Sequence, residues 1–131
     1  MSRKTIKINE KEYEVSSTAY TRFIYKKTFG VGIMADLKKL TEITQKQDEF
    51  RKELQKKKMS DEEIEQQVGI AFMDDIDDLI DVIMKITYIL ILTADSKMCS
   101  YEDWLKSIEK IDLSEPWVSE VTEIAVDSFR G

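Results

Sequence analysis

The stretch DDIDDLIDVIMKITYILILTA, residues 74–94, decides the fold. Its apolar side chains recur every three or four residues, which is the spacing of one face of a helix. The segment VIMKITYILIL inside it is rich in β-branched residues, so a buried strand is the alternative. We predict a helix, because the apolar spacing continues in phase from residue 76 onward. A capping box at Ser60–Glu63 opens this helix on its N-terminal side, and Gly69 is the point at which it kinks or splits.

The residues before position 33 predict a hairpin and a short helix. Residues 4–8 and 11–15 alternate between polar and apolar side chains on either side of Asn9-Glu10, as antiparallel strands do. The apolar positions of the hairpin are Ile6, Ile8, Tyr13 and Val15. A helix over residues 18–29 follows, because Ser16, Ser17 and Thr18 offer an N-cap and Gly30 a C-terminal stop. Its predicted apolar stripe consists of Tyr20, Phe23, Ile24 and Phe29.

Residues 33–58 predict a second, longer helix. Its apolar stripe consists of Ile33, Leu37, Leu40, Ile43, Phe50 and Leu54. The other positions are mostly charged, and pairs such as Glu42 with Lys46 stand four residues apart, which is favourable on a helix. Because so few apolar positions anchor it, we expect a charged helical arm over residues 45–67 that projects from the body of the domain or frays.

The C-terminal part predicts two further helices. Residues 93–98 form a loop, Ser100 caps a short helix, and Pro116 stands in the first turn of the last helix. Trp104 and Trp117 lie on the apolar stripes of these helices, so we predict that both pack in the core. Residues 1–131 are thus expected to form one mostly α domain with a short N-terminal β-hairpin and a long charged helix in the middle.

Composition indicates the broad class of the protein. The 131 residues are 42% hydrophobic and 35% charged, which suits one domain with a core and a highly charged surface. The N-terminal sequence MSRKTIKINE lacks the apolar region of a secretory signal, and the apolar run at residues 86–94 is too short to span a bilayer. We therefore expect an intracellular protein.

Nothing in the composition favours an enzyme. The chain has no histidine, which removes the commonest general base and zinc ligand. Its single cysteine, Cys99, is predicted to be a buried or half-buried structural thiol. The sequence contains neither a Gly-rich phosphate loop nor a nucleophile elbow. We therefore expect no catalytic residue, no cofactor and no metal.

The charges are divided unequally along the chain. Residues 1–58 carry 15 Lys and Arg against 8 Asp and Glu, whereas residues 59–131 carry 5 against 18. The sharpest acidic cluster consists of Asp74, Asp75, Asp77, Asp78 and Asp81, and it lacks the central Gly and terminal Glu of an EF-hand loop. This face is therefore expected to be solvated or to pair with a basic surface. We predict that one arm packs against the other, or against the next subunit head to tail, with the opposed charges setting orientation.

The order of the segments resembles that of a known family. The stretches IKINEKEYEV and YKKTFGVGIMADLKKL, at residues 6–15 and 25–40, are similar to the hairpin and first helix of the tail assembly chaperones of long-tailed bacteriophages. The stretch at residues 74–112 is similar to their apolar helix, loop and following helix, and Tyr101-Glu102-Asp103-Trp104-Leu105 is its most recognisable part. The resemblance covers residues 5–44 and 74–130. Glu10 stands where the family often has Gly, and the charged span 45–67 looks like an insertion.

This resemblance implies a non-enzymatic assembly factor in the host bacterial cytoplasm that is absent from the mature virion. Such proteins bind the long, hydrophobic tape-measure protein, keep it soluble and help recruit tail-tube subunits. In many phages a translational frameshift appends a domain that contacts the tube protein, and this chain would correspond to the unshifted product.

We expect the client to lie as a helix along residues 64–91 or 33–54. The expected contact residues are Leu40, Ile43, Ile80 and Met84.

Two other functions are compatible with the sequence. The first is a small phage or host regulatory adaptor that binds another protein. The second is a nucleic-acid-binding accessory protein that uses the Lys-rich helix at residues 38–58. This second function is disfavoured because acids are interleaved with the lysines and Phe50 is the only aromatic residue there. We therefore expect neither a nucleic acid nor a membrane as partner, while a homo-oligomer remains compatible with the divided charge.

Overall fold

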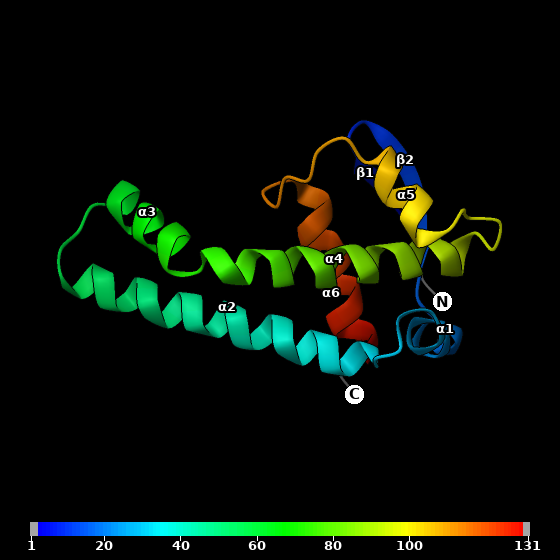
Figure 1. Cartoon of the computed structure of the whole chain (residues 1–131), viewed down its shortest axis with the longest axis horizontal. Coiled ribbons are helices and arrows are strands. Elements are labelled where there is room, and N and C mark those ends of the chain that lie inside the picture. The colour runs from blue at the N-terminus through cyan, green and yellow to red at the C-terminus, as the bar shows by residue number, and fades with distance from the viewer. Residues whose placement is uncertain (1–2, 130–131) are drawn as a thin grey trace.

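A long helix, α4 (Met73–Ala94), forms the centre of the computed structural model, which describes residues 3–129 (Figure 1). Within these residues the other elements are, in chain order, β1 (Arg3–Ile8), β2 (Lys11–Ser16), α1 (Ala19–Phe29), α2 (Ile33–Lys56), α3 (Asp61–Ala71), α5 (Tyr101–Ser107) and α6 (Pro116–Phe129). Helix α4 packs against β2 and against each of the other five helices. The chain is 70% helical, which confirms the prediction of a mostly α domain with an N-terminal hairpin. Residues 1–2 and 130–131 of the predicted domain lie outside the described residues.

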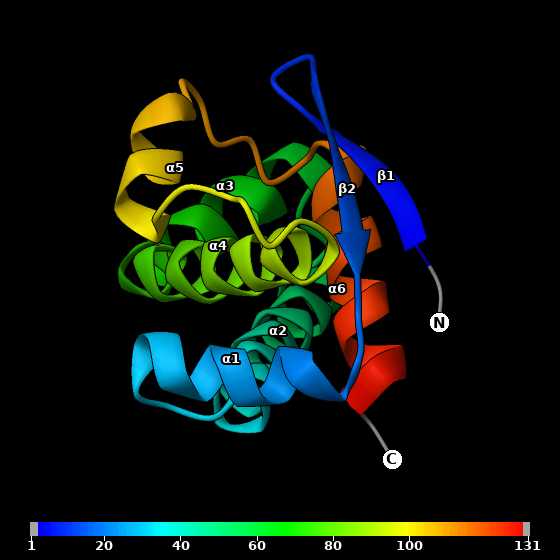
Figure 2. The same cartoon turned by 90° about the vertical axis from the view of Figure 1, so that its right-hand side faces the viewer.

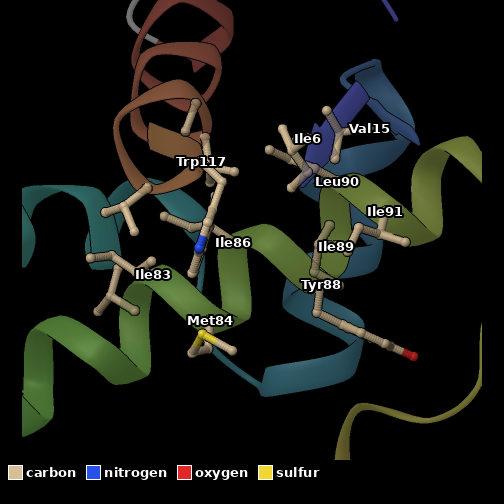
Figure 3. Packing of buried hydrophobic residues seen from close by; sticks show 14 of the residues in the cluster. Ile6, Val15, Ile83, Met84, Ile86, Tyr88, Ile89, Leu90, Ile91 and Trp117 are labelled. Atoms are coloured by element: carbon tan, nitrogen blue, oxygen red, sulfur yellow. The ribbon is translucent and has the colours of Figure 1, made fainter. Parts of the chain in front are cut away.

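The C-terminal half of α4 is buried on nearly all sides. Between residues 82 and 91 only Lys85 reaches solvent to an intermediate extent. The helix satisfies its own backbone hydrogen bonds, so neighbouring elements can cover it without pairing with it. Figure 3 shows Val15 of the hairpin beside Leu90, and Trp117 of α6 beside Ile86. The prediction of a helix here is confirmed, and the alternative of a buried strand is wrong.

Strands β1 and β2 form the predicted antiparallel hairpin. Ile6 pairs with Tyr13, and Ile8 pairs with Lys11. The predicted apolar positions are all buried: Ile6, Ile8, Tyr13 and Val15. β2 packs on α4 and β1 on α6, so the hairpin is stabilised by the helices that it covers (Figure 2).

The hairpin turn contains a residue in an unfavourable conformation. Asn9 and Glu10 have φ values of 50° and 70°, as a two-residue type I′ turn requires. Positive φ suits Asn but is costly for Glu. We expect Glu10→Gly to raise the free energy of unfolding by about 0.5–1 kcal/mol, since relief of this strain exceeds the added entropy of the unfolded chain. Urea denaturation measures this change. Glu12→Gly, within β2, is the control and should lower the free energy of unfolding. A Glu10→Gly variant that is less stable than the parent chain would contradict the expectation.

The predicted helix ends are confirmed where side chains cap them. Thr18 caps α1, and Gly30 ends it with a φ of 78°. Ser60 Oγ and Ser100 Oγ each accept a hydrogen bond of 3.2 Å from a backbone N–H in the first turn of α3 and α5, respectively. These caps satisfy N–H groups that have no partner inside the helix. Local chemistry therefore sets the ends of these helices.

Helix α1 turns a different face to the core from the expected one. Its buried residues are Thr21 and Tyr25, whereas Tyr20 and Phe23 are exposed. Thr21 Oγ1 lies 2.9 Å from the hydroxyl oxygen of Thr93 near the end of α4, so the inward face makes a polar contact with the central helix. The predicted stripe is thus wrong for Tyr20 and Phe23, while Ile24 and Phe29 are half-buried against the core.

A buried polar cluster joins α1, α2 and α4. The Tyr25 hydroxyl donates a hydrogen bond to the Asp36 carboxylate. Lys85 Nζ lies 3.8 Å from Asp36 Oδ2 and 3.0 Å from Asp81 Oδ2. Burial, together with the adjacent Asp36 carboxylate, raises the pKa of Tyr25 far above its usual range, so its hydroxyl remains a donor. The cluster fixes the mutual position of three helices.

The distal part of α2 and helix α3 form an arm with a small core of its own. Leu54, Ile64 and Val68 are buried there, separately from the main core. Arg51 Nε donates to Glu65 Oε1 across the two helices at 2.9 Å. The predicted charged arm over residues 45–67 lies within this part of the chain, where its helices pack on each other.

The predicted break in the long helix lies near Gly69 but not at it. Helix α3 ends at Ala71, and α4 begins at Met73. Phe72 lies between them with φ −112° and ψ 20°, outside the helical region. Its ring packs against Phe50 of α2 at a centroid distance of 5.7 Å. The chain therefore turns where an aromatic side chain packs into the arm.

The predictions for the two tryptophans are confirmed, whereas the prediction for the cysteine is wrong. Trp104 and Trp117 are both buried, as predicted. Cys99 is exposed, so the prediction of a buried or half-buried thiol is wrong. It lies in the surface loop after α4, and its carbonyl oxygen accepts a hydrogen bond of 2.6 Å from the Tyr88 hydroxyl.

Candidate partner-binding groove

An apolar groove of about 590 Å³ lies between α2 and the C-terminal half of α6. Its apolar lining consists of Met34, Leu37 and Val126, with Thr41 and Gln45 extending it along α2. Figure 1 shows α6 crossing α4 and ending beside the N-terminal half of α2. We call this surface the α2–α6 groove.

The sequence of α2 places two kinds of residue on adjacent helix faces. Ile33, Leu37 and Leu40 are buried, whereas Met34 is 39% exposed and Thr41 is exposed. Residues 34, 37, 38, 41, 42 and 45 follow the three- and four-residue spacing of one helix face. One face of α2 therefore packs inward and the adjacent face lines the groove, and the two faces meet at Leu37, which is buried and also lines the groove.

The rim of the groove carries one charge of each sign. Lys38 and Glu42 lie four residues apart on α2, and both are exposed. An apolar floor with a charged rim suits the apolar face of an amphipathic helix whose polar side chains reach the rim. Met34 adds adaptability, because a methionine side chain is flexible and polarisable. Within residues 3–129 no group of three or more His, Cys, Asp or Glu side chains is placed to hold a metal ion.

The four expected contact residues lie elsewhere. Leu40, Ile43 and Met84 are buried in the main core, and Ile80 is half-buried against it. In the folded chain these side chains contact its own core, and a partner could reach the buried ones only if the elements that cover them separated. Their role in partner binding stays a prediction, and an exposed surface for a partner has to be sought on other residues.

Sequence reasoning missed Met34 and Val126. Met34 directly follows a buried position of the predicted α2 stripe, and its apolar character was the only available signal. Val126 comes from α6, more than eighty residues away in the chain. Only the tertiary fold brings these two side chains to one groove.

The acidic cluster is partly paired. Lys39 Nζ on α2 lies 3.5 Å from Asp78 Oδ1, and Lys85 lies 3.0 Å from Asp81. Among the described residues Asp74 and Asp77 make no ion pair, and both are exposed. The cluster therefore pairs with a basic helix on one side and faces solvent on the other.

A scan against protein-family models, a search of curated proteins and a search of solved structures found no match to this chain. In the part of the chain that the structure covers, residues 3–129, no helix is both long and apolar enough to cross a membrane.

Proposed function

We propose that the chain is a tail assembly chaperone of a long-tailed bacteriophage, which binds the tape-measure protein and keeps it soluble. The observation that carries this proposal is the α2–α6 groove, an exposed apolar surface with a charged rim. The choice of the tape-measure protein as client rests on the resemblance of the segment order to that of tail assembly chaperones. The protein acts without catalysis in the host bacterial cytoplasm, helps recruit tail-tube subunits and is absent from the mature virion.

The groove supports this proposal through the chemistry of its lining. A tape-measure segment that forms an amphipathic helix would place apolar side chains against Met34, Leu37 and Val126. Each such side chain contributes about 1.5–3 kcal/mol when it is fully buried. Losses of translational and side-chain entropy offset much of this gain. The result is moderate affinity, as a chaperone that must release its client requires.

Substitutions in the groove test the proposal. Co-expression with the candidate tape-measure protein should leave that client soluble with the parent chain. Met34→Asp and Val126→Asp place a carboxylate on the apolar floor, and each should weaken binding about tenfold or more. The measurement is the soluble fraction of the client and its recovery in complex with the chain.

Met73→Asp is the matched control, because Met73 is 63% exposed at the junction of α3 and α4, away from the groove. It should leave client solubility unchanged. Thermal melts by circular dichroism show whether each variant folds. A client that stays equally soluble without the chain, or a folded Met34→Asp variant that binds as well as the parent, would contradict the proposal.

A further inference from the structure

Helix α1 presents an exposed aromatic and basic surface, which we call the α1 patch. The rings of Tyr20 and Phe23 lie side by side with centroids 6.0 Å apart and planes tilted by 37°, and Phe23 is 60% exposed. Lys27 Nζ lies 5.9 Å from the Phe23 ring centroid, and Arg22 and Lys26 flank the same ring. Two large exposed rings side by side are unusual on a solvated helix and are typical of an interaction surface.

The positive charge of the α1 patch is not paired with an acidic side chain of residues 3–129. Helix α1 contains three basic residues and no acidic one. Within residues 3–129, Arg22, Lys26 and Lys27 make no ion pair. The surface that covers this patch should therefore be both apolar and acidic.

Among the described residues, the junction of α3 and α4 has this chemistry, and we call it the α3–α4 corner. Ile70 and Met73 are its exposed apolar residues. Asp74 and Asp77 follow them in the chain at the start of α4, and both are exposed and make no ion pair among the described residues. The corner thus combines large apolar side chains with unpaired negative charge, as the α1 patch combines them with positive charge.

The two surfaces cannot meet within one molecule. Figure 1 shows α1 at one end of the long axis, while α3 and the start of α4 lie toward the other end. Two α1 patches would repel each other, and so would two α3–α4 corners. We propose that the α1 patch binds the α3–α4 corner of a second copy of this chain, so that copies associate head to tail. Because this contact joins two different surfaces, each added copy leaves one of each free, and the assembly can grow.

This inference is independent of the proposed chaperone function, because neither surface contains a residue of the α2–α6 groove. Its test is the mass of the purified chain by sedimentation over a concentration series. The parent chain should show a mean mass that rises with concentration. Higher salt should weaken the association by about tenfold, because it screens the opposed charges.

Two single substitutions separate this arrangement from other forms of association. Phe23→Asp damages the α1 patch only, and Met73→Asp damages the α3–α4 corner only. Each variant alone should remain monomeric at concentrations where the parent assembles. A mixture of the two should form a heterodimer with one copy of each variant. The intact α1 patch of Met73→Asp binds the intact α3–α4 corner of Phe23→Asp, and no intact surface is left for a third copy.

Several outcomes would overturn the head-to-tail contact. The first is a parent chain that is monomeric at every concentration, and the second is a Met73→Asp variant that assembles like the parent. The third is a mixture of the two variants that stays monomeric although each variant melts like the parent. Assembly that Phe23→Asp abolishes and Met73→Asp leaves intact would instead indicate a contact between two α1 patches.

Discussion

Replacing Trp104 with alanine should lower the free energy of unfolding by about 3–5 kcal/mol, the largest effect expected for a single side chain here. Trp104 is 1% exposed and lies where three elements meet. Its ring centroid lies 6.5 Å from that of Tyr13 in the hairpin and 5.8 Å from that of Tyr88 in α4. Removal of the indole therefore leaves a cavity that separates the hairpin and α5 from the central helix. Urea denaturation followed by circular dichroism measures the change.

Trp104→Phe is the matched control for this prediction. The indole Nε1 of Trp104 is buried and has no hydrogen-bond partner within residues 3–129. Phenylalanine therefore loses volume but no hydrogen bond, and the cost should stay below about 1.5 kcal/mol. An alanine variant that loses less than the phenylalanine variant would show that this aromatic contact does not hold the hairpin and α5 to the core.

The second large effect is expected at Asp36. Asp36→Ala should lower the free energy of unfolding by about 2–4 kcal/mol, because it leaves the buried Tyr25 hydroxyl without its acceptor and removes one partner of Lys85. The positive charge of Lys85 is still partly balanced in this variant, because Asp81 Oδ2 lies 3.0 Å from Lys85 Nζ. Asp36→Asn keeps an acceptor for Tyr25 and should lose less.

The Lys39–Asp78 pair provides the comparison for this buried cluster. Both side chains are 49% exposed and their charged atoms are 3.5 Å apart. Because exposed ion pairs contribute little, Asp78→Ala should change stability by less than about 0.5 kcal/mol. If Asp36→Ala and Asp78→Ala proved equally mild by denaturation, the Tyr25–Asp36–Lys85 cluster would not be what joins α1, α2 and α4.

The elements that the sequence predicts well are those set by local chemistry. The hairpin follows from alternation around Asn9-Glu10, both ends of α1 follow from its capping residues and Gly30, and the start of α3 follows from Ser60. The helical phase of residues 76–91 outweighed the β-branched composition of the same segment. In each case residues close together in the chain carry the information.

The features that the sequence could not predict depend on residues far apart in the chain. Tyr20 and Phe23 look like core residues of an amphipathic helix, but α1 instead buries Thr21, which contacts Thr93, and Tyr25, which donates to Asp36. The α2–α6 groove likewise needs Val126 to lie beside Met34. Periodicity identifies an apolar face, and it does not say which neighbour covers that face.

The divided charge of the chain is resolved in part by the fold. Lys39 with Asp78, and Arg51 with Glu65, join α2 to α4 and α3, as expected if one arm packs against the other. Positive charge remains on α1, and negative charge remains at the α3–α4 corner. Because these two surfaces carry unpaired charges of opposite sign, we expect association between copies.

The most direct test of the chaperone proposal is methionine oxidation in the presence and absence of a soluble tape-measure segment. Met34 and Met73 are both accessible, at 39% and 63%, and only Met34 lies in the groove. The Phe23→Asp background keeps Met73 free of contacts between copies. Mass spectrometry should show that the bound client protects Met34 from oxidation severalfold while Met73 reacts as before. Oxidation of Met34 at the same rate in the free and the client-bound chain would contradict client binding in the α2–α6 groove.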